Sequence, residues 1–503
     1  MSSFVCNFPF ITILASLFSG AASSVIPGKW ARRWNKLLLV IIAILSFVTM
    51  RYSWKLGTYY TYSMGHFPAP WGNEIRVGVL ETFMAMFFSL LMLLCLMGGE
   101  AEREREIEES KQNLYYVLAD LLISSLLSLI YTNDIFTAYV FVEINTLAAC
   151  GLIMIRQYGR TMEAATRYLI MNLLGSGLFL LGICFLYDIT GHLLMSNMRA
   201  VVDEIVKQGT YTVPLIISLG LMVVGLAIKT ALYPFHAWVP DAYGYSTLSS
   251  SALLSALVSK GYVFLLIKII MRVIGFDFVS KTSVSNVLFI YGLIGMMMGS
   301  INAIRQKDIR RMLAYSSVAQ MGYIYMGLDL GTEVGIVAAI FHIISHMATK
   351  AMLFVAAGGL AAASGDHKEF AYLRGAAYRN KMAGLAFLSG ALSMIGLPLF
   401  SGFISKLLFA QASMDQGYKM FFALAAIAIS TILNTIYFMK AVMIIYTPIY
   451  SEEKNRIGGR IIYVKDQAMK VCVFAAFIAI DLVLGLFSEP IVSLLTIGIQ
   501  MFG

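Results

Sequence analysis

The sequence predicts an all-α polytopic membrane protein with about 14 transmembrane helices. Of its 503 residues, 59% are hydrophobic and only 13% are charged, whereas a soluble domain averages about 25% charged residues. Apolar runs long enough to span a bilayer follow one another along the chain, and short connections hold most of the basic residues. The net charge of +9 therefore reflects orientation in a lipid bilayer rather than nucleic-acid binding.

The expected spans follow from apolar windows of ~20 residues. No long soluble domain fits between them. They are centred near residues 15, 44, 88, 122, 145, 177, 222, 258, 294, 320, 346, 394, 432 and 480.

The basic connections predict the orientation. They follow spans 1, 3, 5, 9, 11 and 13, within residues 29–36, 103–111, 156–160, 305–311, 368–381 and 454–465. The positive-inside rule places this side in the cytoplasm and both termini outside it, in the cell membrane of a prokaryote. Lys268, Arg272 and Lys281, near the end of span 8, do not fit this rule.

Two spans are expected to be broken. Pro234 and Pro240 follow Lys229 closely, and Gly396-Leu-Pro398 precedes Lys406. Proline removes a helix hydrogen bond, and interrupted helices at corresponding positions of two halves indicate an inverted-repeat transporter. The prediction is therefore helices 1–3 (1–110), two inverted five-helix repeats (111–275 and 276–450) with broken helices 7 and 12, and a last helix (451–503).

The cysteines give no sign of a metal or cluster site. Cys6, Cys95, Cys150, Cys184 and Cys472 are scattered, without a Cys-x-x-Cys pair. A glycine-rich phosphate loop and a dinucleotide fingerprint are both missing. We expect no cofactor and no metal in this chain, and any redox chemistry would belong to other subunits.

Several titratable residues fall inside or at the edge of the apolar spans. A charge in hydrocarbon costs at least ~2.5–3.5 kcal/mol, so such residues are usually functional. Glu143 alone would take up a proton, and we expect it to pair with Lys229. A structural salt bridge is the alternative, although buried ion pairs are weak stabilisers. The proposed relay comprises Glu143, Lys229, Lys260, His342, His346, Lys350 and Lys406.

A water path is expected to lead to Lys260. Ser251, Ser255 and Ser259 recur every four residues and would share one face of a regular helix. Small-residue helix packing is the alternative. His236, at the edge of span 7, is a weaker candidate for the same path.

His342, His346 and Lys350 form one stripe on span 11, because they are spaced by four residues. Histidine titrates near neutrality and suits a proton relay. Internal packing and a zinc site are the alternatives. Ile343 stands where a metalloprotease has glutamate, and the lysine disfavours a metal.

Three further features complete the expectations. Lys406, after the second break, would be the terminal group of the path. Asp481, within the last span, is expected to have a structural partner or a subunit contact. The acidic stretch 100–109 is expected to be a solvated cytoplasmic turn.

Four segments together resemble the antiporter-like subunit family. This family includes the D subunit of Mrp-type cation/proton antiporters, the corresponding subunit of energy-converting membrane-bound hydrogenases, and the antiporter-like subunits of respiratory complex I. The segments are 229–242, 311–323, 341–354 and 396–406. Phe67-Pro-Ala-Pro-Trp-Gly72 looks like the Mrp and hydrogenase branch.

The resemblance implies 14 helices, two inverted repeats and a charged axis at mid-membrane. Carried over by position, Glu143 and Lys229 would be the gating pair, Lys260 the middle relay, His342 and His346 the bridge, and Lys406 the exit group. This chain departs from the family pattern at Ala242-Tyr-Gly-Tyr, where prolines are common, and at Gly78, where an aspartate is common.

The functional hypothesis is a membrane subunit that moves H⁺, or exchanges Na⁺ for H⁺, within a multisubunit complex. An Mrp-type antiporter or a hydrogenase-type redox complex is expected. The alternatives are a complex I subunit, a stand-alone antiporter and a structural spacer. The residues leave the coupling ion open.

Overall fold

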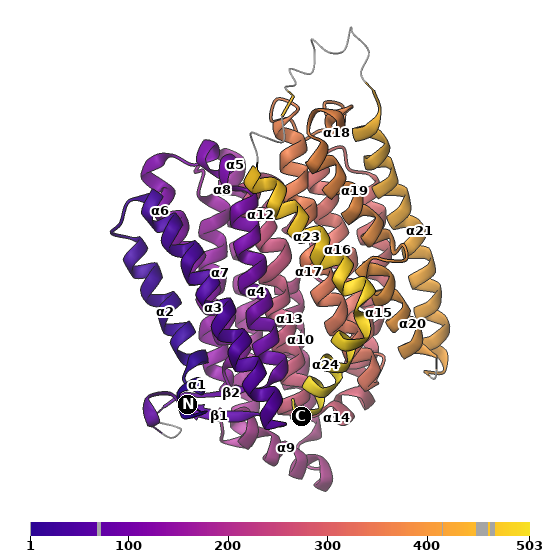
Figure 1. Cartoon of the computed structure of the whole chain (residues 1–503). Helices are drawn as coiled ribbons and strands as arrows, with labels where there is room; N and C mark the ends of the chain where they lie inside the picture. Colours follow the sequence, from indigo (N-terminus) through magenta and orange to yellow (C-terminus); the bar gives the residue numbers. More distant parts are fainter. Residues whose placement is uncertain (1, 68–71, 415, 449–460, 463–467, 503) are drawn as a thin grey trace.

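The computed structural model describes residues 2–67, 72–414, 416–448, 461–462 and 468–502 (Figure 1). Long helices dominate it, as the apolar runs predict. They are α2 (Phe8–Ser23), α3 (Gly28–Leu56), α4 (Val79–Gly98), α6 (Gln112–Tyr131), α7 (Ile135–Met154), α8 (Gly159–Thr190), α10 (Thr212–Thr230), α15 (Ser283–Ile304), α16 (Ile309–Leu328), α17 (Glu333–Ala362), α19 (Lys381–Ile395), α20 (Ser401–Ser413), α21 (Tyr418–Tyr446), α23 (Ala468–Leu486) and α24 (Ser488–Gln500).

One further long helix contains two π-helical turns. It is assembled from α12 (Leu248–Leu253), the π-helical η3 (Leu254–Val258), α13 (Ser259–Lys268) and the π-helical η4 (Ile269–Ile274). π-Helical turns are rare and are frequent at functional sites. Lys260 lies two residues after the end of the first of them.

Shorter elements cap the two ends of the bundle. They are α1 (Ser2–Val5), η1 (Met64–His66), α5 (Glu100–Glu106), η2 (Glu109–Lys111), α9 (Met195–Gln208), α11 (Val239–Tyr245), α14 (Phe276–Lys281), α18 (Ala376–Arg379) and the strands β1 (Tyr60–Ser63) and β2 (Glu74–Val77). The strands pair antiparallel, with Tyr60 opposite Val77. This small sheet is absent from the all-α prediction.

The all-α polytopic architecture is confirmed. Eleven helices of the described residues are long and apolar enough to cross a membrane, and Phe8–Ser23 and Lys381–Ile395 are shorter apolar helices. Every one of the expected span centres falls within a helix. The count of 14 crossings, the domain boundaries and the inverted symmetry remain predictions.

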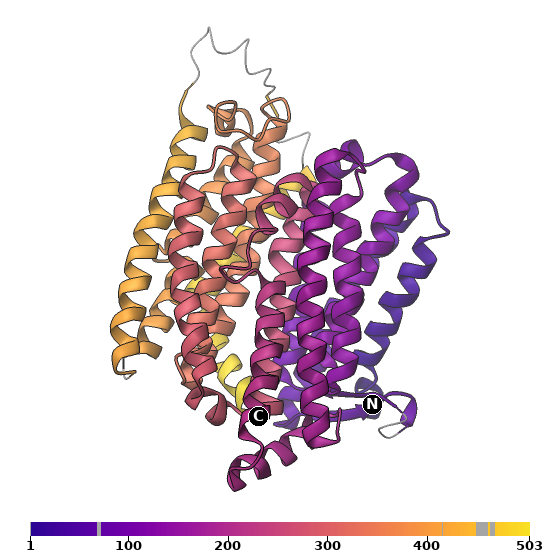
Figure 2. The ribbon, with the colours of Figure 1, turned by 180° about the vertical axis from the view of Figure 1, so that it is seen from behind.

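The two halves of the chain stand side by side in both views (Figures 1 and 2). The yellow α23 runs obliquely across the front, and it contacts α4, α17, α19 and α20. Both ends of the chain lie at one end of the bundle with β1, β2 and α9, while α5 and α18 lie at the other (Figure 1). The shared end agrees with the predicted topology, but which side of the membrane it faces remains a prediction.

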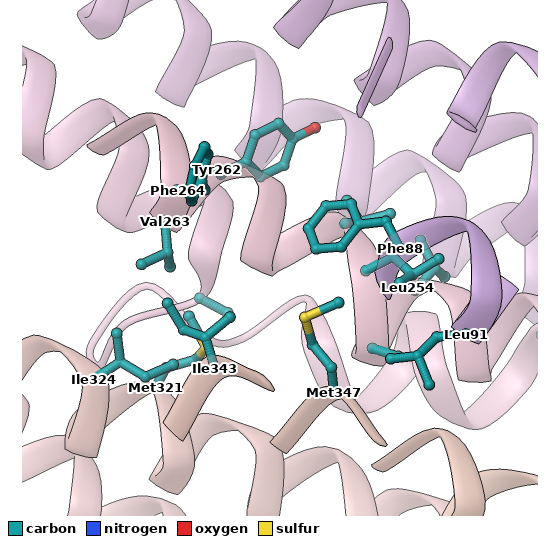
Figure 3. Packing of buried hydrophobic residues seen from close by; sticks show 14 of the residues in the cluster. Phe88, Leu91, Leu254, Tyr262, Val263, Phe264, Met321, Ile324, Ile343 and Met347 are labelled. Atoms are coloured by element: carbon teal, nitrogen blue, oxygen red, sulfur yellow. The ribbon is translucent and has the colours of Figure 1, made fainter. Parts of the chain in front are cut away.

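Two helices are enclosed by protein along their most apolar stretches, residues 248–274 and 333–362. Figure 3 shows the packing around them: Phe88 and Leu91 of α4 and Met321 and Ile324 of α16 lie near Ile343 and Met347 of α17. These apolar contacts keep lipid away. Polar groups on the enclosed helices therefore face other protein groups.

The acidic stretch is only in part the solvated turn that we expected, because Glu104, Glu108 and Glu109 are exposed but other glutamates are buried. Glu100 and Glu102 are buried, because Glu100 forms ion pairs with Arg32 (2.9 Å) and Lys36 (2.5 Å), and Glu102 pairs with Lys470. The stretch therefore ties α5 to α3 and α23.

The basic residues at the end of span 8 have structural partners. Nζ of buried Lys268 donates to the carbonyls of Leu129 and Ile130, both at 3.0 Å, at the end of α6. Arg272 forms an ion pair with Glu81 of α4, and both side chains are 1% exposed. Burial against protein explains why Lys268 and Arg272 do not fit the orientation rule, whereas Lys281 is exposed.

Candidate functional site

Lys229 lies at the first helix break, as predicted. α10 ends at Thr230, and the next residue, Ala231, has φ 61°, a left-handed conformation that turns the chain out of the helix. Nε1 of Trp238, beyond the break, donates to the carbonyl of Ile228 (3.2 Å) and so satisfies a helix-end acceptor. The break therefore fixes a fully buried lysine at the end of α10.

The direct partner of Lys229 is a hydroxyl. Its Nζ donates to Oγ1 of Thr146 on α7 at 2.8 Å and lies 5.4 Å from the centroid of the Tyr262 ring. The Tyr262 hydroxyl lies 3.3 Å from Thr146 Oγ1 and donates to Oδ1 of Asn145 at 2.9 Å. Thr146 thus joins Lys229 to a buried polar network.

Glu143 lies one turn from Thr146 on the same helix. It is close enough for its charge to act on Lys229. The ion pairs within the described residues do not include one between Glu143 and Lys229, and the buried Oε1 of Glu143 has no hydrogen bond in the structure. The expected ion pair between Glu143 and Lys229 is therefore not formed, and Thr146 is the direct partner of the lysine.

Lys260 is fully buried on α13 and binds the end of the preceding π turn. Its Nζ donates to the carbonyl of Ser255 and to Oγ of Ser259, the latter at 3.0 Å. A π turn holds more residues than an α turn. Ser255 and Ser259 are therefore not aligned as on a regular helix.

The three serines have separate partners. Ser251 Oγ donates to the carbonyls of Tyr243 (2.7 Å) and Thr247 (3.1 Å), while Ser255 Oγ lies 3.0 Å from Ser317 Oγ. The expected stripe of serines is thus interrupted. Of the three serines, Ser255 and Ser259 accept hydrogen bonds from Lys260.

The histidines stack along α17, as their spacing predicts. The rings of His342 and His346 are parallel, at 3°, with centroids 5.9 Å apart. His342 Nδ1 lies 2.5 Å from Ser405 Oγ of α20. Neither ring nitrogen of buried His346 has a hydrogen bond in the structure.

Lys350 continues this stripe. Its buried Nζ donates to the carbonyl of Leu313 on α16 at 3.0 Å. The charges of Lys260 and Lys350 both act on His346, and those of Lys406 and Lys260 act on His342. Lys260, Lys350, Lys406 and the two histidines therefore lie within electrostatic reach of one another. A cluster of three or more His, Cys, Asp or Glu suited to a metal is not found in the described segments.

Lys406 lies at the second break, as predicted. α19 ends at Ile395, Gly396 has φ 91°, and α20 begins at Ser401. Nζ of Lys406 donates to the carbonyl of Ile395 (2.6 Å) and to Oγ1 of Thr431 (2.9 Å). The ammonium therefore lies on the negative end of a half-helix, a favourable place for a cation.

Asp481 has the structural partners that we expected. Its Oδ1 accepts from Ser393 Oγ at 3.0 Å, from the backbone N–H of Ser401 at 3.3 Å, and from Ser401 Oγ.

His236 lies in the first break, stacked on Tyr233 with centroids 5.0 Å apart. These contacts do not place His236 in the row of lysines and histidines.

Comparison with known proteins gives the family. Residues 132–434 match the model described as NADH:quinone oxidoreductase/Mrp antiporter, transmembrane. The chain belongs to this family. The match covers more than half of the chain and includes both breaks.

Two relatives show how the family divides. The chain is 34% identical to NADH-quinone oxidoreductase subunit N of Desulforudis audaxviator, over 87% of this chain and 86% of the relative. It is 26% identical to the Na(+)/H(+) antiporter D subunit of Alkalihalophilus pseudofirmus, over 85% of this chain and 83% of the relative. Of the three kinds of complex named in the resemblance, complex I and the Mrp-type antiporter are thus represented.

Two solved structures share the fold. A chain of the membrane-bound sulfane sulfur reductase, an archaeal respiratory membrane complex, aligns with TM-score 0.84 and 23% identity, over 100% of this chain and 97% of that chain. A chain of the Mrp complex from a Dietzia species aligns with TM-score 0.86 and 23% identity, over 99% and 97%.

The structure joins two of the family-like segments. Asp241, after the first break, forms an ion pair with Arg311 at 3.0 Å, at the start of the second segment. Phe67-Pro-Ala-Pro-Trp-Gly72, which favours the Mrp and hydrogenase branch, lies largely outside the described residues.

Sequence reasoning missed the neutral partners of the charged row. These are Thr146, Tyr262, Ser405 and Thr431. It also missed Glu81, which faces Gly78: a Cβ on Gly78 would lie 2.8 Å from Oε2 of Glu81. For Thr146, Tyr262, Ser405 and Glu81, the available signal was closeness in sequence to Glu143, Lys260, Lys406 and Gly78. Thr431 lies 25 residues from Lys406 and had no such signal.

Proposed function

We propose that this chain is a proton-translocating, or Na⁺/H⁺-exchanging, antiporter-like subunit of a multisubunit membrane complex. The observation that carries the proposal is the set of buried lysines and histidines between Lys229 at one helix break and the half-buried Lys406 at the other. A proton relay needs titratable groups shielded from lipid, and α13 and α17 provide both conditions.

In this scheme a proton enters near Lys229 from the cytoplasmic side. It passes laterally by Lys260, His346 and His342 and leaves at Lys406. The open geometry of Glu143 supports a gating role. When its charge approaches Lys229 the ammonium is favoured, and when it withdraws the proton is pushed onward. Lys350 continues the stripe of His342 and His346, and the hydroxyls of Thr146 and Ser405 contact Lys229 and His342.

Other membrane subunits are the proposed partners, because the relatives and structural neighbours are named as parts of larger complexes. The family-like motifs favour an Mrp-type antiporter or a hydrogenase-type redox complex. The 34% identity to a quinone oxidoreductase subunit supports a complex I-like assembly instead. Mass spectrometry of the complex purified in mild detergent distinguishes these assemblies. If iron–sulfur subunits co-purify, the complex is a redox-driven pump. If all co-purifying proteins are small membrane subunits and sister antiporter-like chains, the complex is a secondary antiporter.

A structural role is the second candidate, since most of the buried lysines donate hydrogen bonds to carbonyls. Lys260 and Lys268 provide a matched test on one helix. Lys260→Met should abolish proton transport by the purified complex in proteoliposomes and leave its assembly intact. Lys268→Met should instead impair assembly, because carbonyls of α6 lose a buried charged donor.

Gel filtration and proton-sensitive dye quenching give the two readouts. If Lys260→Met transports protons like the wild type, the relay is wrong. If it fails to assemble while the Lys268→Met complex forms and transports, the spacer role replaces the relay.

A further inference from the structure

We infer that Asp481 and the hydroxyls around the second break form a binding site for a dehydrated Na⁺ ion. The inference deepens the proposed function, on which it rests, by assigning the exchanged cation to a place in the fold. The site joins α17, α19, α20 and α23, and its residues are Asp481, Ser345, Thr349, Ser393 and Ser401.

The oxygens of these residues converge within hydrogen-bonding range. Ser345 Oγ lies 2.6 Å from Ser401 Oγ, which donates to Oδ1 of Asp481. Ser393 Oγ lies 3.4 Å from Ser401 Oγ and 3.5 Å from Thr349 Oγ1. All five residues are buried. Unwound segments beside half-helices are established places for Na⁺ in transporters.

The hydroxyl protons already have acceptors. Thr349 donates to the carbonyl of Ser345 at 2.8 Å, and Ser393 donates to Asp481 at 3.0 Å. A hydroxyl whose proton is directed elsewhere keeps lone pairs for a cation. The cluster therefore offers oxygen ligands without a change in its hydrogen bonds.

The charge of Asp481 is not balanced by a basic side chain. The ion pairs of the described residues do not include Asp481, and its exposure is 0%. Its hydrogen bonds from the described residues all reach Oδ1, whereas the buried Oδ2 has none. The N-terminus of α20 offsets only about half a charge. The remaining negative charge needs a cation or a proton.

Asp120, a second buried carboxylate, differs from Asp481 in its hydrogen bonds. Asp120 of α6 accepts from Ser19 (2.7 Å) and Ser23 (3.1 Å) on one oxygen and from Asn35 (2.5 Å) on the other. Both oxygens of Asp120 are thus used by protein donors. Asp481 has a carboxylate oxygen left for a ligand, and its single charge matches a monovalent rather than a divalent cation.

The position of the proposed Na⁺ site couples it to the row of lysines and histidines. Ser401 lies one turn before Ser405, the partner of His342. A Na⁺ beside Ser401 would disfavour a proton on His342, because like charges repel in a buried site. Occupancy by Na⁺ and protonation of the row would then alternate, which is the requirement for exchange.

The test is equilibrium binding of ²²Na⁺ to the whole detergent-purified complex, with choline chloride as the background salt. We expect Asp481→Asn to bind one Na⁺ fewer per complex than the wild type. Asp120→Asn, the matched buried carboxylate, should bind the same number as the wild type. Ser393→Ala should keep the site and raise its Kd several-fold.

Equal binding by the Asp481→Asn and wild-type complexes, or no binding by either, overturns the inference. If Asp481→Asn does not assemble, the Kd of Ser393→Ala decides, and an unchanged Kd also overturns it. Loss of proton transport in Asp481→Asn with unchanged ²²Na⁺ binding would make the residue a proton group. Lys229→Ala should lose proton transport and keep the Na⁺, so failure of the relay and failure of this site are distinguishable.

Discussion

The two helix breaks hold their lysines in different ways. At the first break, Lys229 is fully buried and bonds the side-chain hydroxyl of Thr146, with Glu143 nearby but unpaired. At the second, Lys406 is half-buried and bonds backbone carbonyls of α19. A carboxylate on a rotatable side chain can approach or withdraw, whereas the end of a half-helix is fixed. The first lysine is therefore suited to gating and the second to a constant terminal position.

After the loss of a relay lysine itself, the largest effect is expected at Glu143. Glu143→Gln removes the only charge proposed to hold the Lys229 proton, so proton transport in proteoliposomes should fall by about 10²-fold. Glu163→Gln, which removes an exposed carboxylate paired with Arg167 at 2.7 Å, should leave transport unchanged. Similar proton transport by the Glu143→Gln and Glu163→Gln variants would show that Glu143 does not gate the row.

A smaller effect is expected from crowding at the second break. A Cβ on Gly396, where φ is 91°, would lie 3.0 Å from Cδ and 3.1 Å from Nζ of Lys406. Gly396→Ala should therefore displace the ammonium and lower proton transport by about tenfold.

Gly191→Ala controls for backbone strain alone, because Gly191 has φ 69° and open space around its Cβ position. It should lower the unfolding temperature slightly and leave transport unchanged. If both glycine variants transport equally, the fixed position of Lys406 is not required.

The smallest effect concerns Lys368, outside the spans, which donates to the carbonyl of Gly244 (3.2 Å) beyond the first break. Burial, and to a lesser extent the charge of Arg310, lower the pKa of Lys368 to about 7. Because the unfolded chain binds this proton more tightly, the folded state should gain stability as pH rises from about 7 to about 10.5.

Lys368→Gln should remove that gain from the pH profile of the unfolding temperature. Lys307→Gln, in the same cavity of about 460 Å³, should keep it. Identical profiles for wild type and Lys368→Gln would show that burial of this lysine is not as tight as the structure indicates.

The breaks and the charged row were predictable because local chemistry determines them. Proline and glycine mark where α10 and α19 end, and a lysine in an apolar run is visible in any sequence. The partners were not predictable, since Thr146 lies 83 residues from Lys229 and Ser405 lies 63 residues from His342.

The π turn before Lys260 and the burial of Glu102 also escaped prediction. The apolar pattern of residues 248–260 does not distinguish 3.6 residues per turn from a local π turn. The charges of 100–109 look solvated until Lys470, far along the chain, is brought beside Glu102. Both features depend on tertiary packing.

The central claim is that the buried row moves protons and that Lys229 is its gated entrance. The most direct measurement is proton transport by the assembled Lys229→Ala complex in proteoliposomes. The account predicts a normal complex by gel filtration and no proton transport above that of empty liposomes. Undiminished transport by the assembled variant would contradict it.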